Sequence, residues 1–304
     1  MRLIPILMAL CLVPLAAFSA EPVMSGPLAG YVLDQESRSV RPVVGIPGSA
    51  YVASPVLEDV DALAVSPDGA RALVSQGDSL ALVERHSSGS FEAVGIQETA
   101  AAEKLAWSPD GSAAVAYSSG TRTAQILTGG KFSRAVDLSA LEQVSVVAVG
   151  NSGENLLIGA EGGLYLAEKG GEVRLIAAIA KPVAIALEGA DAFVAAGEVF
   201  ELQDYAGKAT LMTFAGEAEA LGVQVERGGK RLIVASSRSV AVYDVASRTV
   251  AARLDLEFTP TMLSRLGSET TFMLNSGAAG IEPMYMIDVG REPAVFFVPS
   301  GREQ

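Results

Sequence analysis

The sequence predicts an all-β protein with the fold of a β-propeller, built from four-stranded antiparallel blades around a central axis. Two observations support this prediction. Short turn signals recur at steps of about forty residues, each between two runs of apolar and β-branched residues. A second series of turn signals alternates with the first over nearly the whole chain. A fixed period of this length is typical of sheets repeated around a ring.

The first series consists of short turns that we expect to join the two outer strands of each blade. They lie at 36–39, 87–90, 128–131, 169–172, 205–208, 246–249 and 290–293. Around the first and the sixth turn, residues 33–40 and 243–250 share an Asp, a Ser-Arg pair, a hydroxyl residue and a Val in the same order. This agreement between distant segments indicates a repeated hairpin.

The second series consists of turns that we expect to join the two inner strands of each blade. They lie at 68–69, 110–111, 152–153, 189–190, 228–229 and 267–268. The best preserved copies have the sequence Ser-Pro-Asp-Gly, at 66–69 and 108–111. Proline presets the turn backbone, the aspartate side chain caps the turn, and glycine takes the position with positive φ.

A Ser-Pro-Asp-Gly turn between two strands, followed by a hairpin with an Asp-x-x-Ser turn, resembles the YVTN-type and TolB-like bacterial propeller repeats. It is similar more loosely to WD-type blades. The likeness covers roughly residues 26–300, although the middle copies at 151–153 and 188–191 lack the proline. The resemblance implies a propeller but no particular activity, because these families include binding proteins, assembly factors and enzymes.

Seven blades are the preferred count, and six are the alternative. The chain has six inner strand pairs and seven outer hairpins, the first of them at 31–44. This additional hairpin suits a ring in which the two chain ends share one blade and leave no long edge exposed. Residues 49–58 are candidates for a missing strand. A β-sandwich or an open row of small β domains also fits the alternation, but the fixed period favours the ring.

Residues 1–19 are expected to be a secretory signal peptide. An almost wholly apolar run at 3–18 follows a positive start, and small residues stand at Ala17 and Ser19, so we expect cleavage after Ser19. A retained membrane anchor is the alternative, but the run is short for a span and contains two prolines. The remaining chain is expected to divide into a linker at 20–25, the propeller at 26–300 and a tail at 301–304.

The rest of the composition agrees with export. Cys11 lies inside the apolar run and follows Leu10, where lipoprotein processing requires a small residue, so we expect no lipid anchor. The mature chain then has no cysteine, and its stability must come from burial. The formal charge of the full sequence, −13, disfavours nucleic acids and anionic lipid surfaces. We therefore predict a periplasmic or secreted protein without nucleic-acid partners and without stable membrane insertion after signal cleavage.

The chain offers few groups for catalysis or metal binding. Its one histidine, His86, directly precedes a turn and is expected to be exposed, which argues against a Ser-His-Asp relay. Metal sites made of several imidazoles or thiolates are excluded by residue count. No phosphate-binding glycine motif and no Gly-x-Ser-x-Gly elbow occurs, and Gly-Gly-Lys at 228–230 is interpreted as a hairpin turn. We therefore predict no catalytic, metal-binding or cofactor-binding residues and no cofactor.

Acidic and aromatic residues supply the remaining candidates. Neither of the two acidic groups has the ligand spacing of a calcium loop; they are Glu58, Asp59 and Asp61, and Glu198, Glu201 and Asp204. Trp107 ends an inner strand and is expected to pack between neighbouring blades, with ligand contact as the alternative. An aromatic group in the last repeat is expected to pack where the ring closes, namely Tyr285, Phe296 and Phe297.

The sequence favours a binding protein over an enzyme. A repeat scaffold with an export signal predicts a non-catalytic propeller whose loops hold an envelope or extracellular protein, or a small ligand. The alternative is a propeller enzyme of the lactonase, glycosidase or quinoprotein kind. It requires at least three charged side chains with shifted pKa values at the mouth of the central channel. A channel lined only by alanine, valine and serine would exclude it.

Overall fold

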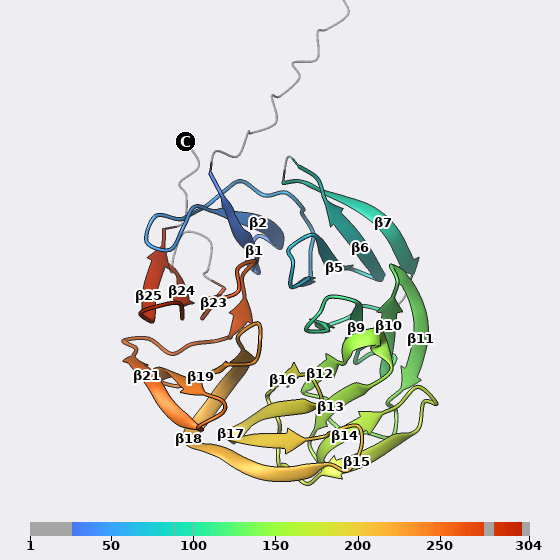
Figure 1. The fold of residues 1–304 in the computed structure, drawn as a ribbon. Coiled ribbons are helices and arrows are strands. Elements are labelled where there is room, and N and C mark those ends of the chain that lie inside the picture. The colour runs from blue at the N-terminus through green and yellow to red at the C-terminus, as the bar shows by residue number, and fades with distance from the viewer. Residues whose placement is uncertain (1–25, 88, 99, 277–282, 300–304) are drawn as a thin grey trace, which may run out of the picture.

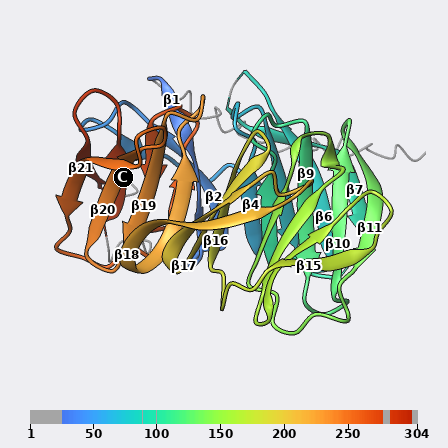
Figure 2. The same ribbon diagram turned by 60° about the horizontal axis from the view of Figure 1, so that its bottom comes forward.

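The computed structural model describes residues 26–87, 89–98, 100–276 and 283–299 of the 304-residue chain. Within these ranges the structure consists of antiparallel β-strands and one short 3-10 helix at Asn151–Gly153. The sheets follow one another in chain order around a ring (Figure 1). Turned by 60°, the strands of each sheet are seen side by side (Figure 2).

The described strands form six sheets. The first has three strands, β1 (Leu28–Asp34), β2 (Ser39–Val44) and β3 (Tyr51–Val52). Three four-stranded sheets follow. The second sheet has β4 (Ala62–Val65), β5 (Arg71–Gln76), β6 (Ser79–Arg85) and β7 (Phe91–Glu98), and the third has β8 (Lys104–Trp107), β9 (Ala113–Ser118), β10 (Thr123–Thr128) and β11 (Lys131–Asp137). The fourth has β12 (Val146–Val149), β13 (Leu156–Ala160), β14 (Gly163–Ala167) and β15 (Val173–Ala177). The fifth sheet has six strands, β16 (Ala184–Glu188), β17 (Asp191–Gln203), β18 (Thr210–Val225), β19 (Arg231–Ser236), β20 (Ser239–Asp244) and β21 (Thr249–Asp255). The last has four, β22 (Ser264–Arg265), β23 (Thr271–Met273), β24 (Met284–Asp288) and β25 (Ala294–Val298).

The six-stranded sheet folds into two packed halves. β17 turns at Gly197, whose φ is +79°, so that the amide of Tyr205 donates to the carbonyl of Ala190 (3.0 Å). The ends of the β5–β6 hairpin in the second sheet are joined by the equivalent bond, from the amide of Arg85 to the carbonyl of Ala70 (2.9 Å). The bend at Gly197 thus takes the place of a hairpin turn. One buried cluster then combines side chains of β17 with those of β19 and β20, which a flat sheet would keep apart; it includes Phe193, Val199, Val234 and Tyr243.

Both predicted series of turns are confirmed. Each outer turn and each inner turn joins two strands that pair with each other, although residue 88 of the second outer turn lies outside the described residues. In the turn at 66–69, the carboxylate of Asp68 accepts hydrogen bonds from the Ser66 hydroxyl (2.5 Å) and the Ala70 amide (3.0 Å). Gly69 has a φ of +68°. The proline-containing turns therefore form as their residue types require.

The two matching outer hairpins have the same geometry. The carboxylate of Asp34 accepts a hydrogen bond from the Ser37 amide (3.4 Å), and that of Asp244 accepts one from the Ser247 amide (2.8 Å). The next residue is in the left-handed region in both turns, at Arg38 (φ +51°) and Arg248 (φ +56°). The sequence agreement thus reflects one turn structure used twice.

The hydrophobic core lies between neighbouring sheets. Each buried cluster combines side chains from two sheets that are adjacent in the ring, or from the two halves of the six-stranded sheet. Because side chains alternate between the two faces of a strand, a middle strand packed on both sides is buried at every position. β9 and β13 show this pattern, whereas the outer strands β7 and β21 have many exposed side chains.

The two chain ends meet by side-chain packing and do not share a sheet. We expected a shared blade, but the described strands of the first sheet pair with one another, and so do those of the last. The reason is that β3, which lies inside the expected 49–58 segment, pairs with β2 and gives the first hairpin its own third strand. A buried cluster joins the two sheets across this seam, including Val32, Val43, Met273, Met284 and Met286.

The aromatic group of the last repeat is only partly placed as expected. Phe296 packs against the seam cluster. Tyr285 instead stacks on Phe258 (ring centroids 3.8 Å apart) in the cluster between the six-stranded and the last sheet. Phe297 is 66% exposed, because alternate side chains of the outermost strand β25 face solvent.

Several predictions about the chain ends lie outside the described residues. They are the signal peptide at 1–19, Cys11, the linker at 20–25 and the tail at 301–304. In the part of the chain that the structure describes, no helix has the length and apolar character needed to cross a membrane.

Candidate functional site

A cavity of about 750 Å³ lies where the inner strands of all the sheets converge. Residues of β1, β4, β8, β12, β16, β22 and the end of β18 line it. Its volume is within the range of cavities that hold small ligands. We call this cavity the central channel. It is the candidate functional site because the repeat brings every sheet to it.

The central channel has an apolar wall and a charged rim. The wall includes Leu63, Leu105, Val147, Ile185, Leu187 and Leu266. Six carboxylates contribute to the lining, those of Asp61, Asp68, Glu103, Glu188, Glu226 and Glu269. Two guanidinium groups join them, Arg227 and Arg265. The channel is therefore not lined only by alanine, valine and serine, and the enzyme alternative is not excluded on that ground.

Trp107 packs between neighbouring sheets, as predicted, and also borders the central channel. Its indole N–H donates to the carbonyl of Ala64 in the preceding sheet (2.8 Å). In return, Arg71 of that sheet donates to the carbonyl of Gly111 (2.7 Å) and lies 5.1 Å from the centre of the indole ring. These contacts fix the indole on the wall.

Glu188 and Arg265 both line the channel, and the pKa of each is shifted. Burial raises the pKa of Glu188, and the positive charge of Arg265 opposes this shift. Burial lowers the pKa of Arg265, and the like charge of Arg227 acts in the same direction. The Arg265 guanidinium donates to the carbonyls of Val225 and Glu269 (3.1 Å for the latter).

A third lining group, Asp68, has a shifted pKa for a structural reason. Burial alone would raise it, but hydrogen bonds from the Ser66 hydroxyl and the Ala70 amide, with the charge of Arg71, outweigh burial and lower the pKa. This carboxylate is committed to its own turn. Three lining groups, Asp68, Glu188 and Arg265, thus have shifted pKa values, which is the number that the enzyme alternative requires. Of the two acids, only Glu188 has a carboxylate that is not bonded within its own turn.

The two predicted acidic groups do not converge on a site. Asp61 forms an ion pair with Arg38 (2.7 Å) and accepts a hydrogen bond from the Gly77 amide (2.7 Å). Glu201 is buried and forms an ion pair with Arg248 (2.7 Å). Among the described residues, no three His, Cys, Asp or Glu side chains are arranged to hold a metal ion.

His86 is placed as predicted. Its side chain is exposed at the β6–β7 turn, and its Nε2 lies 2.7 Å from a carboxylate oxygen of Glu92. It does not line the central channel.

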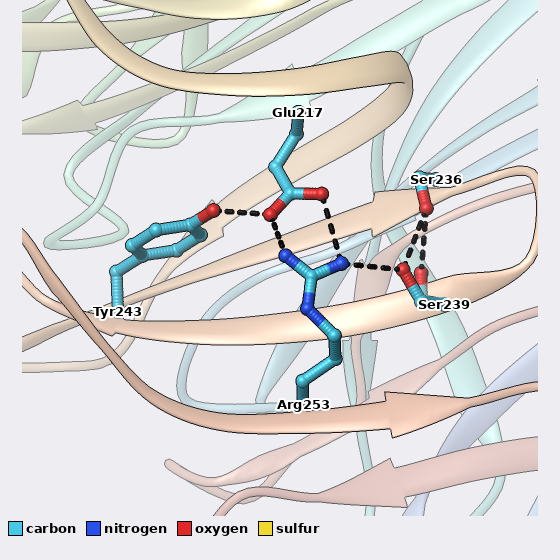
Figure 3. Close-up of polar contacts among 5 residues, drawn as sticks. All are labelled: Glu217, Ser236, Ser239, Tyr243 and Arg253. Atoms are coloured by element: carbon cyan, nitrogen blue, oxygen red, sulfur yellow. Dashed lines mark hydrogen bonds and ion pairs between the residues drawn. The ribbon is translucent and has the colours of Figure 1, made fainter.

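A partly buried polar cluster that sequence reasoning missed lies in the second half of the six-stranded sheet (Figure 3). Glu217 of β18 forms a two-point ion pair with Arg253 of β21 and accepts a hydrogen bond from the Tyr243 hydroxyl of β20. Arg253 also donates to the Ser239 hydroxyl (3.3 Å), which bonds to that of Ser236 (2.9 Å). No sequence signal marks the cluster, because Glu217 is one of 35 acidic residues and its partner Arg253 lies 36 positions further along the chain.

This cluster has the character of a structural clamp. Burial would raise the pKa of Glu217, but hydrogen bonds from Arg253 and Tyr243 and the charge of Arg253 outweigh burial and lower it. The same surroundings raise the pKa of Tyr243, first by burial and then through its bond to Glu217. The lowered pKa favours the ionised carboxylate, which accepts three hydrogen bonds from protein donors and so serves the sheet first.

Comparisons with known proteins support the fold and assign no activity. Residues 29–174, fewer than half of the 304, match the family described as "Lipoprotein LpqB beta-propeller domain". A solved structure, "a functionally unknown protein from Desulfotomaculum acetoxidans DSM 771", is similar with a TM-score of 0.65 and 16% identity, over 90% of this chain and 99% of that one. No curated protein matches the chain significantly. The family match and the antiparallel sheets together support a β-propeller fold, and the first part of the chain is similar to the LpqB propeller domain.

Proposed function

We propose that this protein is an exported β-propeller of seven blades that binds a ligand in its central channel without converting it. The observation that carries the proposal is the channel itself, an apolar-walled cavity with a charged rim to which every sheet contributes. Such a cavity, with a few polar groups that set orientation, is typical of a small-molecule site.

The count of seven follows if each half of the six-stranded sheet is one blade. The buried cluster between the two halves supports this count, because it is built like the clusters between separate sheets. The three-stranded first sheet is then the blade that completes the ring against the last sheet.

The ligand can be identified from an extract of the cell envelope. Purified protein is incubated with the small-molecule fraction, washed and denatured, and the released compounds are identified by mass spectrometry. We expect a compound that is retained by the native protein and lost with Leu63→Trp, because the larger side chain fills the channel beside its wall. Leu175→Trp is the matched control, since Leu175 is 51% exposed on β15 and does not line the channel.

Two results would contradict the proposal. Equal retention by Leu63→Trp and native protein would place the ligand elsewhere, and retention of no compound by the native protein would mean that the channel is not a small-molecule site. The second candidate function, a propeller enzyme, is favoured by the raised pKa of Glu188 beside Arg265. It predicts that a component of the extract is converted by native protein and not by Glu188→Gln.

Export gives a separate expected result. Small residues at Ala17 and Ser19 fit the signal-peptidase recognition positions, and the matching family is described as a lipoprotein domain. We expect protein isolated from the producing cell to begin at Ala20, as measured by intact mass. A mass that includes a lipid on Cys11, or one that starts at Met1, would contradict cleavage after Ser19 in favour of an anchor.

A further inference from the structure

The charges around the central channel are mostly negative. Six carboxylates line it against two guanidinium groups, and the whole chain has a formal charge of −13. A concave site with low-dielectric walls concentrates the field of its charges. By residue count, the lining is therefore more negative than positive.

Most of these carboxylates already have partners in the protein. Asp61 pairs with Arg38, and Asp68 is bonded within its turn. Glu103 accepts hydrogen bonds from the hydroxyl (2.5 Å) and the amide (2.9 Å) of Ser119. The other two lie near arginines, Glu226 near Arg231 (3.9 Å) and Glu269 near Arg227 (3.5 Å). In the described part of the chain, by contrast, no group donates a hydrogen bond to the Glu188 carboxylate.

Glu188 is partly removed from water without gaining a donor. Its side chain lies against the turn of the following half-sheet, where a Cβ on Gly229 would come within 2.8 Å of its Oε1. Arg265 acts on it through its charge, while the hydrogen bonds of that guanidinium go to the carbonyls of Val225 and Glu269. A carboxylate that is partly removed from water and has no protein donor keeps its acceptor positions open to a donor on a ligand.

We propose that the central channel binds a small organic cation, with a primary ammonium group at Glu188 and an apolar body along the wall. This inference rests on the proposed function and names the class of its ligand. The apolar body lies against the apolar wall of the channel, which includes Leu63 and Leu105, and Trp107 borders the same space. The ammonium group supplies the donors that Glu188 lacks, and the apolar part displaces water from the wall.

Trp107 provides a direct measurement, because it is the only tryptophan in the chain and borders the channel. We would titrate n-hexylammonium chloride and follow the tryptophan emission, with sodium hexanoate as the anionic probe of equal carbon count and sodium chloride as the control for ionic strength. We expect a saturable change with hexylammonium that the other two salts do not produce. Glu188→Gln should weaken it about tenfold, since a hydrogen bond to a charged group is lost.

Glu172→Gln is the matched control, because this exposed carboxylate does not line the channel, and it should bind like native protein. The proposal is overturned if hexanoate binds as tightly as hexylammonium, if Glu188→Gln binds like Glu172→Gln, or if hexylammonium gives no saturable change. If one of these results is found while Leu63→Trp still abolishes retention of the extract compound, only the cation proposal is refuted. If Leu63→Trp retains that compound as well as native protein does, the proposed function is refuted.

Discussion

Replacement of Phe272 by alanine is expected to lower the free energy of unfolding by about 3–5 kcal/mol, since it deletes a fully buried aromatic side chain and leaves a cavity. Phe272 lies on β23 with 0% exposure and packs on Ile233 and Val242 of the preceding sheet. Its ring also supports Arg265, whose guanidinium lies 5.2 Å from the ring centre. Urea unfolding followed by far-ultraviolet circular dichroism measures the change.

The matched control is Phe297→Ala. Phe297 is 66% exposed on β25 of the same sheet, so its removal should change stability by no more than about 0.5 kcal/mol. Equal losses from the two variants would mean that the sheets do not pack through Phe272, and the arrangement of neighbouring sheets would then be wrong.

Replacement of Glu217 by alanine is expected to lower the free energy of unfolding by about 2–3 kcal/mol. Breaking a buried ion pair typically costs about 3–5 kcal/mol because the remaining charge stays desolvated, but the Arg253 side chain is 44% exposed and is partly solvated by water. The loss also leaves the buried Tyr243 hydroxyl without its acceptor. A double-mutant cycle with Arg253→Ala separates the ion pair from the tyrosine bond.

The pair formed by Arg174 and Glu168 supplies the comparison. Its side chains are 43% and 53% exposed, and they lie 3.1 Å apart, so Glu168→Ala should cost less than about 1 kcal/mol. If Glu217→Ala costs no more than Glu168→Ala, the cluster in Figure 3 does not clamp the sheet.

The pH dependence of stability follows from the lowered pKa of Glu217. The folded-state pKa lies below the unfolded value of about 4.3. The contribution of Glu217 is therefore complete above the unfolded pKa and is lost as the pH falls through the folded one. Stability curves of native protein and Glu217→Gln should accordingly approach each other below about pH 4. A difference that stays constant down to pH 3 would mean that ionisation of Glu217 is not what stabilises the cluster.

The turns were predictable because their residues determine them locally. Asp68 and Asp110 cap their turns with their own side chains, and Gly69 and Gly111 take positive φ. Such short-range chemistry does not depend on the rest of the fold. The strand order within each sheet follows directly, since short turns join neighbours.

The long-range arrangement was less predictable. The sequence shows seven outer hairpins but only six inner strand pairs, which favoured chain ends that share one blade. In the structure the two ends only pack, because the two-residue strand β3 (Tyr51–Val52), which lies in the candidate segment 49–58, pairs with β2. The bends within the long strands β17 and β18 were not predicted either, because they depend on packing between the two halves of the sheet. Phe193 of the first half and Tyr243 of the second lie in one buried cluster.

The candidate site was the least predictable part. The chain has 35 acidic residues, and neither Glu188 nor Glu217 stands out among them. Their distinct environments arise from contacts with distant residues, Arg265 for the first and Arg253 for the second. Glu201, which was singled out in an acidic cluster, is instead neutralised by Arg248.

The location of the bound ligand is the most direct test of the account. The measurement is a crystal structure of the protein with the compound that the native protein retains from the envelope extract. We predict electron density for the compound inside the central channel, against Leu63 and Leu105, with its polar end at Glu188. Density on the outer strands or on the loops, with the channel holding only water, would contradict it.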